Sequence, residues 1–320
     1  MRKYYFPAGI IIVILALLLT SSCNNNKQKT AAEKAQDSVT AMIKRGDYLV
    51  NSICNCMHCH ATRDFTKFSG PVIHGTEGKG GEEISPGIFV RNITPYTLGS
   101  WTDDEIYKVL TTGIRKNGDT LVPLMPYMAY AKMPKQEIYS IIAYLRTLKS
   151  IENNVPERKI SDTLQPFWTT LYKNLYLKHA EKKILLSSPD DKVKLGEYLV
   201  NAGNCKGCHT KFDRDKMDFD MDAYLSGGRL LKNTALGIAV NSANLTPDTA
   251  TGIGAWTEEI FLAKFNNYRD STHYNHNPGK YNSVMPWTIV AKMNDDDLKA
   301  IYTYLRSIKP IKNKVEKWPQ

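Results

Sequence analysis

Residues 46–60 read GDYLVNSICNCMHCH, and residues 196–209 read GEYLVNAGNCKGCH. Both stretches end in Cys-x-x-Cys-His, and the residues before that pattern are nearly the same. The first copy also contains Cys54 and His58, which have no counterpart in the second copy. The pattern that both copies share is therefore the part of the crowded first cluster that needs an explanation.

The repetition extends well beyond these two stretches. Three further pairs of segments match in the same order: 68–73 with 225–230, 91–106 with 243–260, and 124–151 with 284–311. The last pair aligns without a gap, at an offset of 160 residues. An internal repeat of this kind predicts two copies of one structural unit.

Cys-x-x-Cys-His is the attachment signature of c-type haem. The two cysteines form thioether links to the haem, and the adjacent histidine binds the iron. A lone match could also be a thioredoxin-like motif or half of a zinc site, but the second repeat offers no further pair of zinc ligands before His273. The repeat therefore predicts two covalently bound haem c groups, attached through Cys56, Cys59, Cys205 and Cys208, with His60 and His209 as axial ligands of iron.

Each repeat also carries Met-Pro at the same place, at Met125 and at Met285. A methionine opposite the histidine raises the reduction potential of haem iron, and the proline stiffens the loop that carries it. We therefore predict that Met125 and Met285 are the sixth ligands.

Other residues compete for this role. Met133 and Met293 also repeat, but they lie at the start of the closing helices, where an apolar residue usually packs in the core. His273 and His276 lie in the loop before Met285 and could compete for the second iron. Cys54 has no partner cysteine beyond the signal region and is interpreted as a free thiol near a haem edge.

The repeated loops and aromatic residues suggest supporting roles. We expect the loops that end at Pro71 and Gly228 to supply the backbone carbonyl that fixes each axial histidine. The indole N–H groups of Trp101 and Trp256 are expected to contact a haem propionate or a buried backbone acceptor. The glycine-rich stretch 75–83 lacks the spacing of a phosphate-binding loop and is interpreted as a mobile loop.

Helix signals bound each repeat. Thr102 and Glu105 have the spacing of a capping box, Pro134 is expected in the first turn of the first closing helix, and Asn294 is expected to cap the second. The apolar positions of the closing helices are predicted core residues that pack against the opening helix of each repeat: Ile138, Ile142, Leu145, Leu298, Ile301 and Leu305.

The chain begins like an exported protein. Basic residues precede an apolar run from Ile10 to Leu19, which suits an export signal and is too short to span a bilayer comfortably. Small residues then lead to Cys23, as in a bacterial lipoprotein signal, so Cys23 is the expected lipidation site. Ordinary signal cleavage nearby, or an uncleaved anchor, are the alternatives. The expected location is the periplasmic side of a membrane.

These signals predict the following organisation: a signal peptide (1–22), a flexible tether (23–38), a first repeat (39–152), a packed linker (153–191) and a second repeat (192–320). The linker is too aromatic for a flexible connection and is expected to pack across both repeats and set the distance between the haems. The formal net charge of +10 could steer an acidic protein partner. The lysines are scattered rather than clustered, so nucleic acid is not an expected partner.

The segments NITPYTLGSWTDDEI, PLMPYMAYAKM and IIAYLRTLK, and their second copies, resemble the cytochrome c subunits of membrane-bound alcohol, aldehyde and sugar-acid dehydrogenases. The resemblance covers residues 40 to 312. It implies an all-α fold of two tandem class I-like cytochrome c domains and the haem ligands named above. Larger members carry a third haem and a C-terminal membrane helix. The lipid on Cys23 is the expected substitute for that helix.

Two functions remain open at this stage. The first is a membrane-tethered diheme electron carrier that relays single electrons between a dehydrogenase or quinol-side donor and a downstream cytochrome or oxidase, with both irons closed by His and Met. The alternative is a diheme enzyme of the peroxidase or thiosulfate-dehydrogenase type, in which one haem has an open or labile face.

Overall fold

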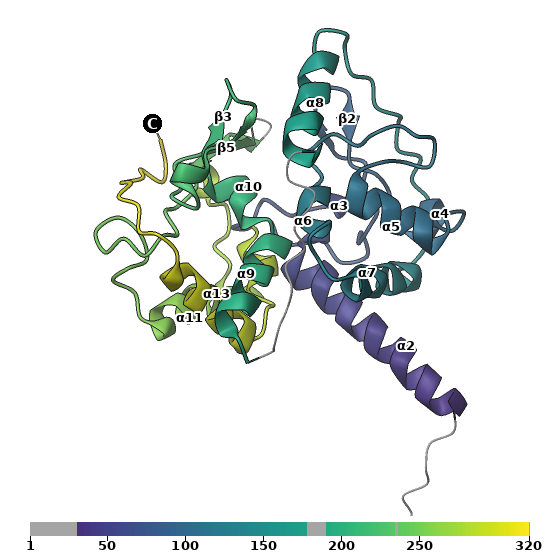
Figure 1. The fold of residues 1–320 in the computed structure, drawn as a ribbon, viewed down its shortest axis with the longest axis horizontal. Coiled ribbons are helices and arrows are strands. Elements are labelled where there is room, and N and C mark those ends of the chain that lie inside the picture. The colour runs from purple at the N-terminus through teal and green to yellow at the C-terminus, as the bar shows by residue number, and fades with distance from the viewer. Residues whose placement is uncertain (1–30, 178–189, 234–235, 320) are drawn as a thin grey trace, which may run out of the picture. The chain divides into compact units, whose positions relative to one another are not determined.

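The structure is a computed structural model that describes residues 31–177, 190–233 and 236–319. This part of the chain is mainly helical, as Figure 1 shows, and no helix within it is both long and apolar enough to span a membrane. Residues 40–320 form one compact unit that contains both repeats. The expected signal peptide and Cys23 lie outside the described residues.

The helices of the first repeat are α2 (Ala31–Tyr48), the π-helix η1 (Leu49–Ile53), α3 (Cys56–His60), α4 (Pro95–Leu98), α5 (Asp103–Thr112), α6 (Tyr127–Tyr130) and α7 (Lys135–Thr147). The linker contains α8 (Gln165–Tyr172) and the π-helix η2 (Lys173–Leu177). The helices of the second repeat are α9 (Lys192–Ala202), α10 (Cys205–His209), η3 (Met221–Ala223), α11 (Glu258–Asn266), η5 (Ser271–His273), η6 (Gly279–Tyr281), α12 (Trp287–Val290) and α13 (Asp295–Ser307). Short antiparallel strands pair as β1 (Glu83–Ser85) with β2 (Ile88–Phe89), β3 (Phe212–Asp213) with β4 (Asp218–Phe219), and β5 (Leu230–Asn233) with β6 (Ile238–Asn241).

In each repeat the opening helix crosses the closing helix at a glycine. A Cβ on Gly46 of α2 would lie 1.9 Å from the carbonyl oxygen of Ser140 in α7. A Cβ on Gly196 of α9 would lie 2.0 Å from that of Ala300 in α13. The glycines therefore allow the helices to touch, and α9 and α13 lie side by side in Figure 1.

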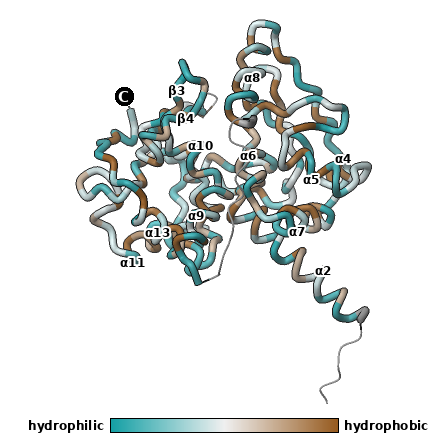
Figure 2. The backbone as a smooth tube through the Cα atoms, viewed as in Figure 1, coloured by the Kyte–Doolittle hydropathy of each residue, from teal (hydrophilic) through white to brown (hydrophobic). Residues whose placement is uncertain are grey.

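The apolar faces of the closing helices form the core, as predicted. All six core positions named above are 7% exposed or less. Figure 2 shows hydrophobic and hydrophilic residues alternating along α7 and α13, as expected for helices with one buried face. In each repeat this packing fixes the opening helix, which leads into the Cys-x-x-Cys-His motif, against the closing helix.

The predicted helix caps are present, with one correction. At the start of α5 the Thr102 hydroxyl accepts a hydrogen bond from Glu105 N, and the Glu105 carboxylate accepts one from Thr102 N. Asn294 caps α13 by accepting from Asp297 N at 2.7 Å. Pro134 is the residue before α7 rather than a first-turn residue, because its ψ of 142° is extended.

The tether prediction is wrong at its C-terminal end. Helix α2 begins at Ala31, so residues 31–38 are helical rather than flexible. This segment is rich in alanine, glutamate, lysine and glutamine and has neither glycine nor proline before Gly46. Strong helix formers of this kind extend a helix that is already anchored by packing at its other end.

The two repeats contact each other through equivalent residues. Tyr48 of the first repeat donates to Asp297 Oδ2 at 2.7 Å, and Tyr198 of the second donates to Glu137 Oε2 at 3.0 Å. The two tyrosines are equivalent in the repeat, and so are the two acidic residues. Each opening helix thus binds the first turn of the other repeat's closing helix.

The linker contacts both repeats where the structure describes it. The Tyr172 ring lies 6.1 Å from the Tyr127 ring of the first repeat. Asn174 donates to the Lys216 carbonyl of the second repeat at 3.1 Å. Phe167, by contrast, is 41% exposed, so part of the aromatic surface that was expected to pack faces solvent.

Candidate haem sites

Each Cys-x-x-Cys-His motif forms a short helix that follows a residue in the left-handed conformation. Asn55 precedes α3 with φ 53°, and Asn204 precedes α10 with φ 51°. Asparagine tolerates this conformation better than most residues other than glycine. The turn separates the motif from the opening helix: Cys59 and Cys208 are exposed residues, and Cys56 and Cys205 are partly exposed.

Both candidate axial histidines are buried and fixed by the backbone. His60 Nδ1 lies 2.7 Å from Arg91 O, and His209 Nδ1 lies 2.8 Å from Ala243 O. Burial lowers the pKa of both histidines, and the hydrogen bonds to these carbonyls oppose that change. A neutral ring that donates from Nδ1 leaves Nε2 available to bind a metal.

The loops expected to fix the histidines are not the ones that do so. The acceptors are Arg91 O and Ala243 O rather than carbonyls of the loops that end at Pro71 and Gly228. The Arg91 side chain points elsewhere, because it donates to Pro156 O at 2.7 Å. A backbone carbonyl does not depend on its side chain, so arginine and alanine can fill equivalent positions.

The stretch 75–83, interpreted from sequence as a mobile loop, contains a structural glycine. Gly80 N donates to His60 O at 3.1 Å, and a Cβ on Gly80 would lie 2.5 Å from Arg91 O. Gly227 makes the same two contacts in the second repeat. The glycine therefore brings the motif and the histidine's acceptor together.

This equivalence corrects the alignment of the two repeats. Residues 225–230 match residues 78–83 in structure, and not residues 68–73. Segments 68–73 and 78–83 each contain a glycine after a small or polar residue, so segment 68–73 resembles residues 225–230 in sequence although it is not their structural counterpart. Residues 68–73 belong to a segment of the first repeat with a different role.

A repeated asparagine supports this glycine and was missed in the sequence. Asn153 Nδ2 donates to Lys79 O at 3.0 Å, and Asn313 Nδ2 donates to Ser226 O at 2.9 Å. The acceptor in each case is the residue just before the glycine. The signal was present in the sequence, since Ile-x-Asn follows each closing helix.

Met125 and Met285 each precede a proline at the centre of a tight turn. Tyr127 N donates to Met125 O at 2.9 Å, and Trp287 N donates to Met285 O at 2.8 Å. The prolines have φ and ψ of −82° and 43°, and of −79° and 58°, close to an inverse γ-turn at about −75° and +65°. Proline favours this φ. Both methionines pack against the core from equivalent turns, and their binding to iron stays a prediction.

The rival residues lie in different environments. Met133 and Met293 are 1% and 3% exposed and belong to the core, as predicted. His273 and His276 are exposed. Cys54 is 5% exposed within the core, and its place near a haem edge stays a prediction.

The additional histidine of the first motif contacts a buried arginine. The Arg63 guanidinium bonds to His58 Nδ1 and donates to the carbonyls of Ser69 and Gly70. Burial, and then the charge of Arg63, lower the pKa of His58 to about 3. The neutral ring can therefore accept from the guanidinium, which gives His58 a structural partner.

The two repeated tryptophans lie partly buried against the core. Within the described residues neither indole N–H has a protein acceptor, so the expected bond to a buried backbone group is not found. Their carbonyls are used instead, since Trp101 O accepts from Arg146 and Trp256 O accepts from Tyr302. A contact between either indole and a haem propionate stays a prediction.

The two motifs lie close together where the repeats meet. A Cβ on Gly203, which precedes α10 by two residues, would lie 3.3 Å from Ile53 O. The chain segments that lead into the two motifs therefore approach each other at Gly203 and Ile53. Burial is the largest cause that raises the pKa of Cys59; Arg63 lowers this pKa, and Glu82 and Cys208 raise it by smaller amounts.

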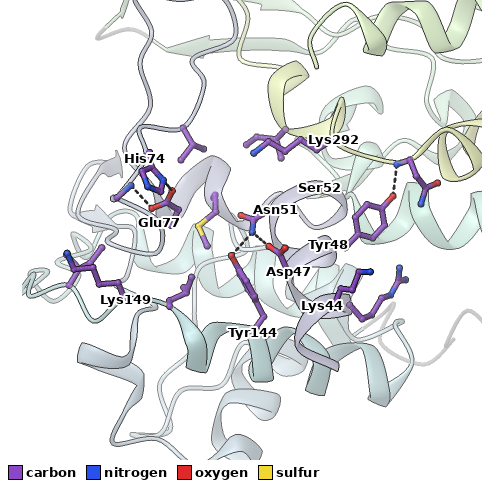
Figure 3. A pocket seen from close by; sticks show the side chains of 18 of the residues that line it. Lys44, Asp47, Tyr48, Asn51, Ser52, His74, Glu77, Tyr144, Lys149 and Lys292 are labelled. Atoms are coloured by element: carbon purple, nitrogen blue, oxygen red, sulfur yellow. Dashed lines mark hydrogen bonds and ion pairs between the residues drawn. The ribbon is translucent and has the colours of Figure 1, made fainter. Parts of the chain in front are cut away.

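A separate cavity of about 1090 Å³ opens beside the contact between the repeats. Figure 3 shows Asn51 bonded to Asp47 and Tyr144 on one side of it, with Lys292 of the second repeat on the other. No motif cysteine, axial histidine or Met-Pro methionine lines it. Its wall does include Met57, between the two cysteines of the first motif, so the cavity borders the first candidate haem site without containing its predicted iron ligands.

The residues present fit c-type haem in both repeats. Each pair of cysteines contains one exposed and one partly exposed residue, and each histidine has a lowered pKa and is held by its outer nitrogen. A haem c would be held by these groups in each repeat and, when bound, would supply reversible one-electron chemistry of iron.

Comparison with known proteins agrees with this geometry. Residues 193–309 match the family model of cytochrome c. The chain is 30% identical over 87% of its length to the cytochrome c subunit of quinone alcohol dehydrogenase from Gluconobacter oxydans (strain 621H), and 28% identical over 87% to the gluconate 2-dehydrogenase cytochrome c subunit of Pantoea cypripedii. It spans 57% and 61% of the length of these two relatives.

A further relative is described as a diheme protein. The chain is 25% identical over 80% of its length to a diheme cytochrome c-type protein of Cereibacter sphaeroides, and covers 82% of that protein. The chain thus contains a cytochrome c domain, which implies covalently bound haem c, and it is similar along most of its length to the cytochrome c subunits of alcohol and gluconate dehydrogenases.

Proposed function

We propose that this chain is a diheme c-type cytochrome that relays single electrons. The haems attach through the four motif cysteines, and the axial ligands are His60 with Met125 and His209 with Met285. The observation that supports this most is the hydrogen bond from each motif histidine to a backbone carbonyl, Arg91 O or Ala243 O. This bond leaves the other ring nitrogen of a neutral imidazole free to bind iron in both repeats.

The contact between the repeats suits electron transfer between two haems. The segments that precede the motif helices approach each other, because a Cβ on Gly203 would lie 3.3 Å from Ile53 O. Thioethers at the motif cysteines would hold both haems near this contact between the repeats. The protein's own contribution is to fix both ligand sets and the distance between them.

Basic residues lie beside both motifs, and on this ground we propose an acidic redox partner. Lys206 has a lowered pKa because of burial and then because of the charge of Lys132 in the other repeat. Arg63 and Arg229 lie beside the motifs, since each bonds to the residue before the second motif cysteine. We propose a dehydrogenase or quinol-side donor and a downstream cytochrome or oxidase as partners. Reduction by the donor should therefore slow as salt concentration rises.

The membrane attachment is part of the same proposal. Removal of a signal peptide at residues 1–22 and lipidation of Cys23 would hold the protein on the periplasmic side of a membrane. Expression with a radiolabelled fatty acid tests this, because wild type should carry the label and sediment with membranes. Cys23→Ala should carry none.

Haem content and carbon monoxide binding test the central proposal. The purified protein should contain two covalent haems per chain, and the fully reduced protein should bind no carbon monoxide because both irons are closed by methionine. Uptake of the gas by one haem would instead favour the diheme enzyme, of the peroxidase or thiosulfate-dehydrogenase type. One haem per chain would overturn the proposal.

A further inference from the structure

Residues 65–69 of the first repeat run along the segment of the second repeat that leads to Met285. Phe68 N donates to Asn275 O at 2.8 Å, and Asn277 N donates to Thr66 O at 2.6 Å. The Phe68 ring is buried and stacks on the Tyr268 ring, with centroids 5.4 Å apart. The two repeats are therefore joined by backbone pairing as well as by side chains in this region.

Asn282 closes this contact three residues before Met285. Its side-chain oxygen accepts from Ser69 N at 2.8 Å, and its Nδ2 donates to Phe65 O at 3.0 Å. Asn282 is 2% exposed. One amide side chain of the second repeat thus binds both ends of the segment from the first repeat.

Ser69 binds the methionine turn itself. Its hydroxyl donates to Met285 O at 2.6 Å and accepts from Trp287 N at 2.9 Å. These are the two backbone groups that close the turn around the proline. Ser69 is fully buried and has a φ of 63°, an unfavourable conformation for serine. The surrounding structure therefore places this hydroxyl in the turn at a conformational cost.

The segment is anchored in the first repeat near its haem motif. Arg63 donates to the carbonyls of Ser69 and Gly70 and contacts the His58 ring. A continuous set of hydrogen bonds thus connects the first motif, through Arg63 and Ser69, to the turn that carries Met285. His58 has no counterpart in the second motif, where Gly207 occupies its place.

The Met125 turn is supported differently. Met125 N donates to Val122 O at 3.2 Å within the same repeat. The second repeat bonds to the helix that follows this turn, where Asn201 Nδ2 donates to Ala129 O at 2.8 Å. At the Met285 turn, by contrast, the other repeat bonds directly to the two backbone groups that close the turn.

We propose that Ser69 and Asn282 are positioning residues for the sixth ligand of the second haem, so that the first repeat holds Met285 on the iron of the second. This inference rests on the proposed function, because it takes Met285 as an iron ligand. A thioether is a weak ligand, and its bond to iron depends on how well the protein orients it. Loss of the hydrogen bonds made by Ser69 or Asn282 should therefore free the sixth position of the second haem iron and leave the first haem six-coordinate.

Ser69→Gly in the full, haem-loaded chain tests the proposal. Glycine removes the hydroxyl and also relieves the unfavourable φ, so a loss of ligation cannot be attributed to added backbone strain. We expect the weak long-wavelength absorption band of methionine-ligated ferric haem to fall to half its intensity. We also expect the reduced protein to bind one equivalent of carbon monoxide, with a lowered reduction potential for one haem. Asn282→Ala should have the same effect and provides a second variant if the first loads haem poorly.

Double variants identify which haem is affected. Ser69→Gly added to Met285→Ala should change nothing further, because the ligand is already gone. Ser69→Gly added to Met125→Ala should remove the rest of the methionine band. Ser140→Ala is the matched control, since Ser140 is 2% exposed and its hydroxyl bonds only within α7; it should leave the band at full intensity.

The outcomes separate the inference from the proposed function. Suppose that Met285→Ala halves the band while Ser69→Gly and Asn282→Ala both leave it unchanged. The hydrogen bonds of Ser69 and Asn282 are then not needed for ligation, and the inference is overturned, whereas Met285 remains the ligand. If Met285→Ala itself leaves the band unchanged, the ligand assignment of the proposed function is wrong and the inference fails with it.

Discussion

The turns that carry Met125 and Met285 have the same backbone geometry but different supports. Both are closed by a hydrogen bond across a proline. Ser69 of the other repeat bonds directly to the Met285 turn, whereas near the Met125 turn the other repeat bonds, through Asn201, to Ala129 O of the following helix. A repeat can thus preserve a ligand's local geometry while the contact between repeats makes the two sites unequal.

The proximal sides of the two sites, by contrast, are nearly identical. The left-handed asparagine, the carbonyl acceptor of the histidine, the glycine at that carbonyl and the asparagine behind it recur in both repeats. Each of these acts through the backbone or through a bond to the backbone. The two sites are therefore alike on the histidine side, where backbone groups make the contacts. They differ on the methionine side, where a side chain of the other repeat bonds to the Met285 turn.

Alanine at the repeated glycine should give the largest loss of stability. A Cβ at Gly80 or Gly227 meets a carbonyl oxygen at 2.5 or 2.4 Å, and both glycines have positive φ. Strain and steric overlap together should cost about 3 kcal/mol of the free energy of unfolding for each substitution. Guanidinium unfolding of the haem-loaded variants measures this cost.

Two other glycines provide matched controls. Gly75 and Gly237 also have positive φ, but a Cβ at either meets nothing within 4 Å. Alanine there should cost only the backbone strain, about 1 kcal/mol. An equal cost at Gly80 and Gly75 would mean that the close approach to the histidine's acceptor contributes nothing.

Loss of the asparagine behind this glycine should have the next largest effect. Asn153→Ala and Asn313→Ala each leave a partly buried carbonyl without its donor, at a cost of about 2 kcal/mol. Asn154→Ala is the control for the first repeat, because that side chain is exposed and bonds only to Tyr96. Thermal unfolding of the three variants should show Asn154→Ala within experimental error of wild type.

The comparison also shows which features of the sites were predictable. The motif cysteines and histidines, the Thr102 cap and the core of the closing helices follow local spacing, and local spacing is visible in a sequence. The role of Arg91 was not predictable, because its carbonyl acts and its side chain does not. The asparagine at 153 could have been found, since its repeat was present after the closing helix.

Contacts between the repeats were beyond the reach of local patterns. Ser69 lies in a segment that was aligned with the wrong part of the second repeat, so its hydroxyl had no visible counterpart. Its partners at 282 and 285 are more than 200 residues away. The flexible-tether prediction failed for a different reason, since polar composition alone does not distinguish a tether from an exposed helix such as the start of α2.

Removal of one tyrosine hydroxyl tests the approximate symmetry of the contact between repeats. Tyr198→Phe should cost about 1.5 kcal/mol, because the fully buried hydroxyl bonds to a carboxylate. Tyr48→Phe should cost about 1 kcal/mol, since its bonds to Asp297 and Asn294 are partly exposed. Equal losses would indicate that burial does not distinguish the two halves of the contact.

The pH dependence of this contact has a defined sign. Desolvation, and then the bond to Asp297, raise the pKa of Tyr48 above its ordinary value of 10.0. The folded state therefore favours the protonated phenol, so this stabilisation is complete below pH 10.0 and decreases as pH rises toward the folded-state pKa. The free energy of unfolding, measured at neutral and at alkaline pH, should decrease less between these two conditions in Tyr48→Phe than in wild type.

The smallest expected difference is between the caps of α5 and α11. Thr102 takes part in a reciprocal capping box, whereas Thr257 accepts one bond from Ile260 N and the third helical residue there is apolar. Thr102→Ala should cost about 1 kcal/mol and Thr257→Ala about 0.5 kcal/mol. Urea unfolding of both variants measures the difference.

The box also predicts an acid dependence at α5. The bond from Thr102 N is the largest of the effects that lower the pKa of Glu105 below its ordinary value of 4.5. Its stabilisation is therefore present above pH 4.5 and is lost as pH falls through the folded-state pKa. Glu105→Ala should reduce stability at neutral pH and have less effect in acid. A cost that does not change with pH would show that the carboxylate charge is not what closes the box.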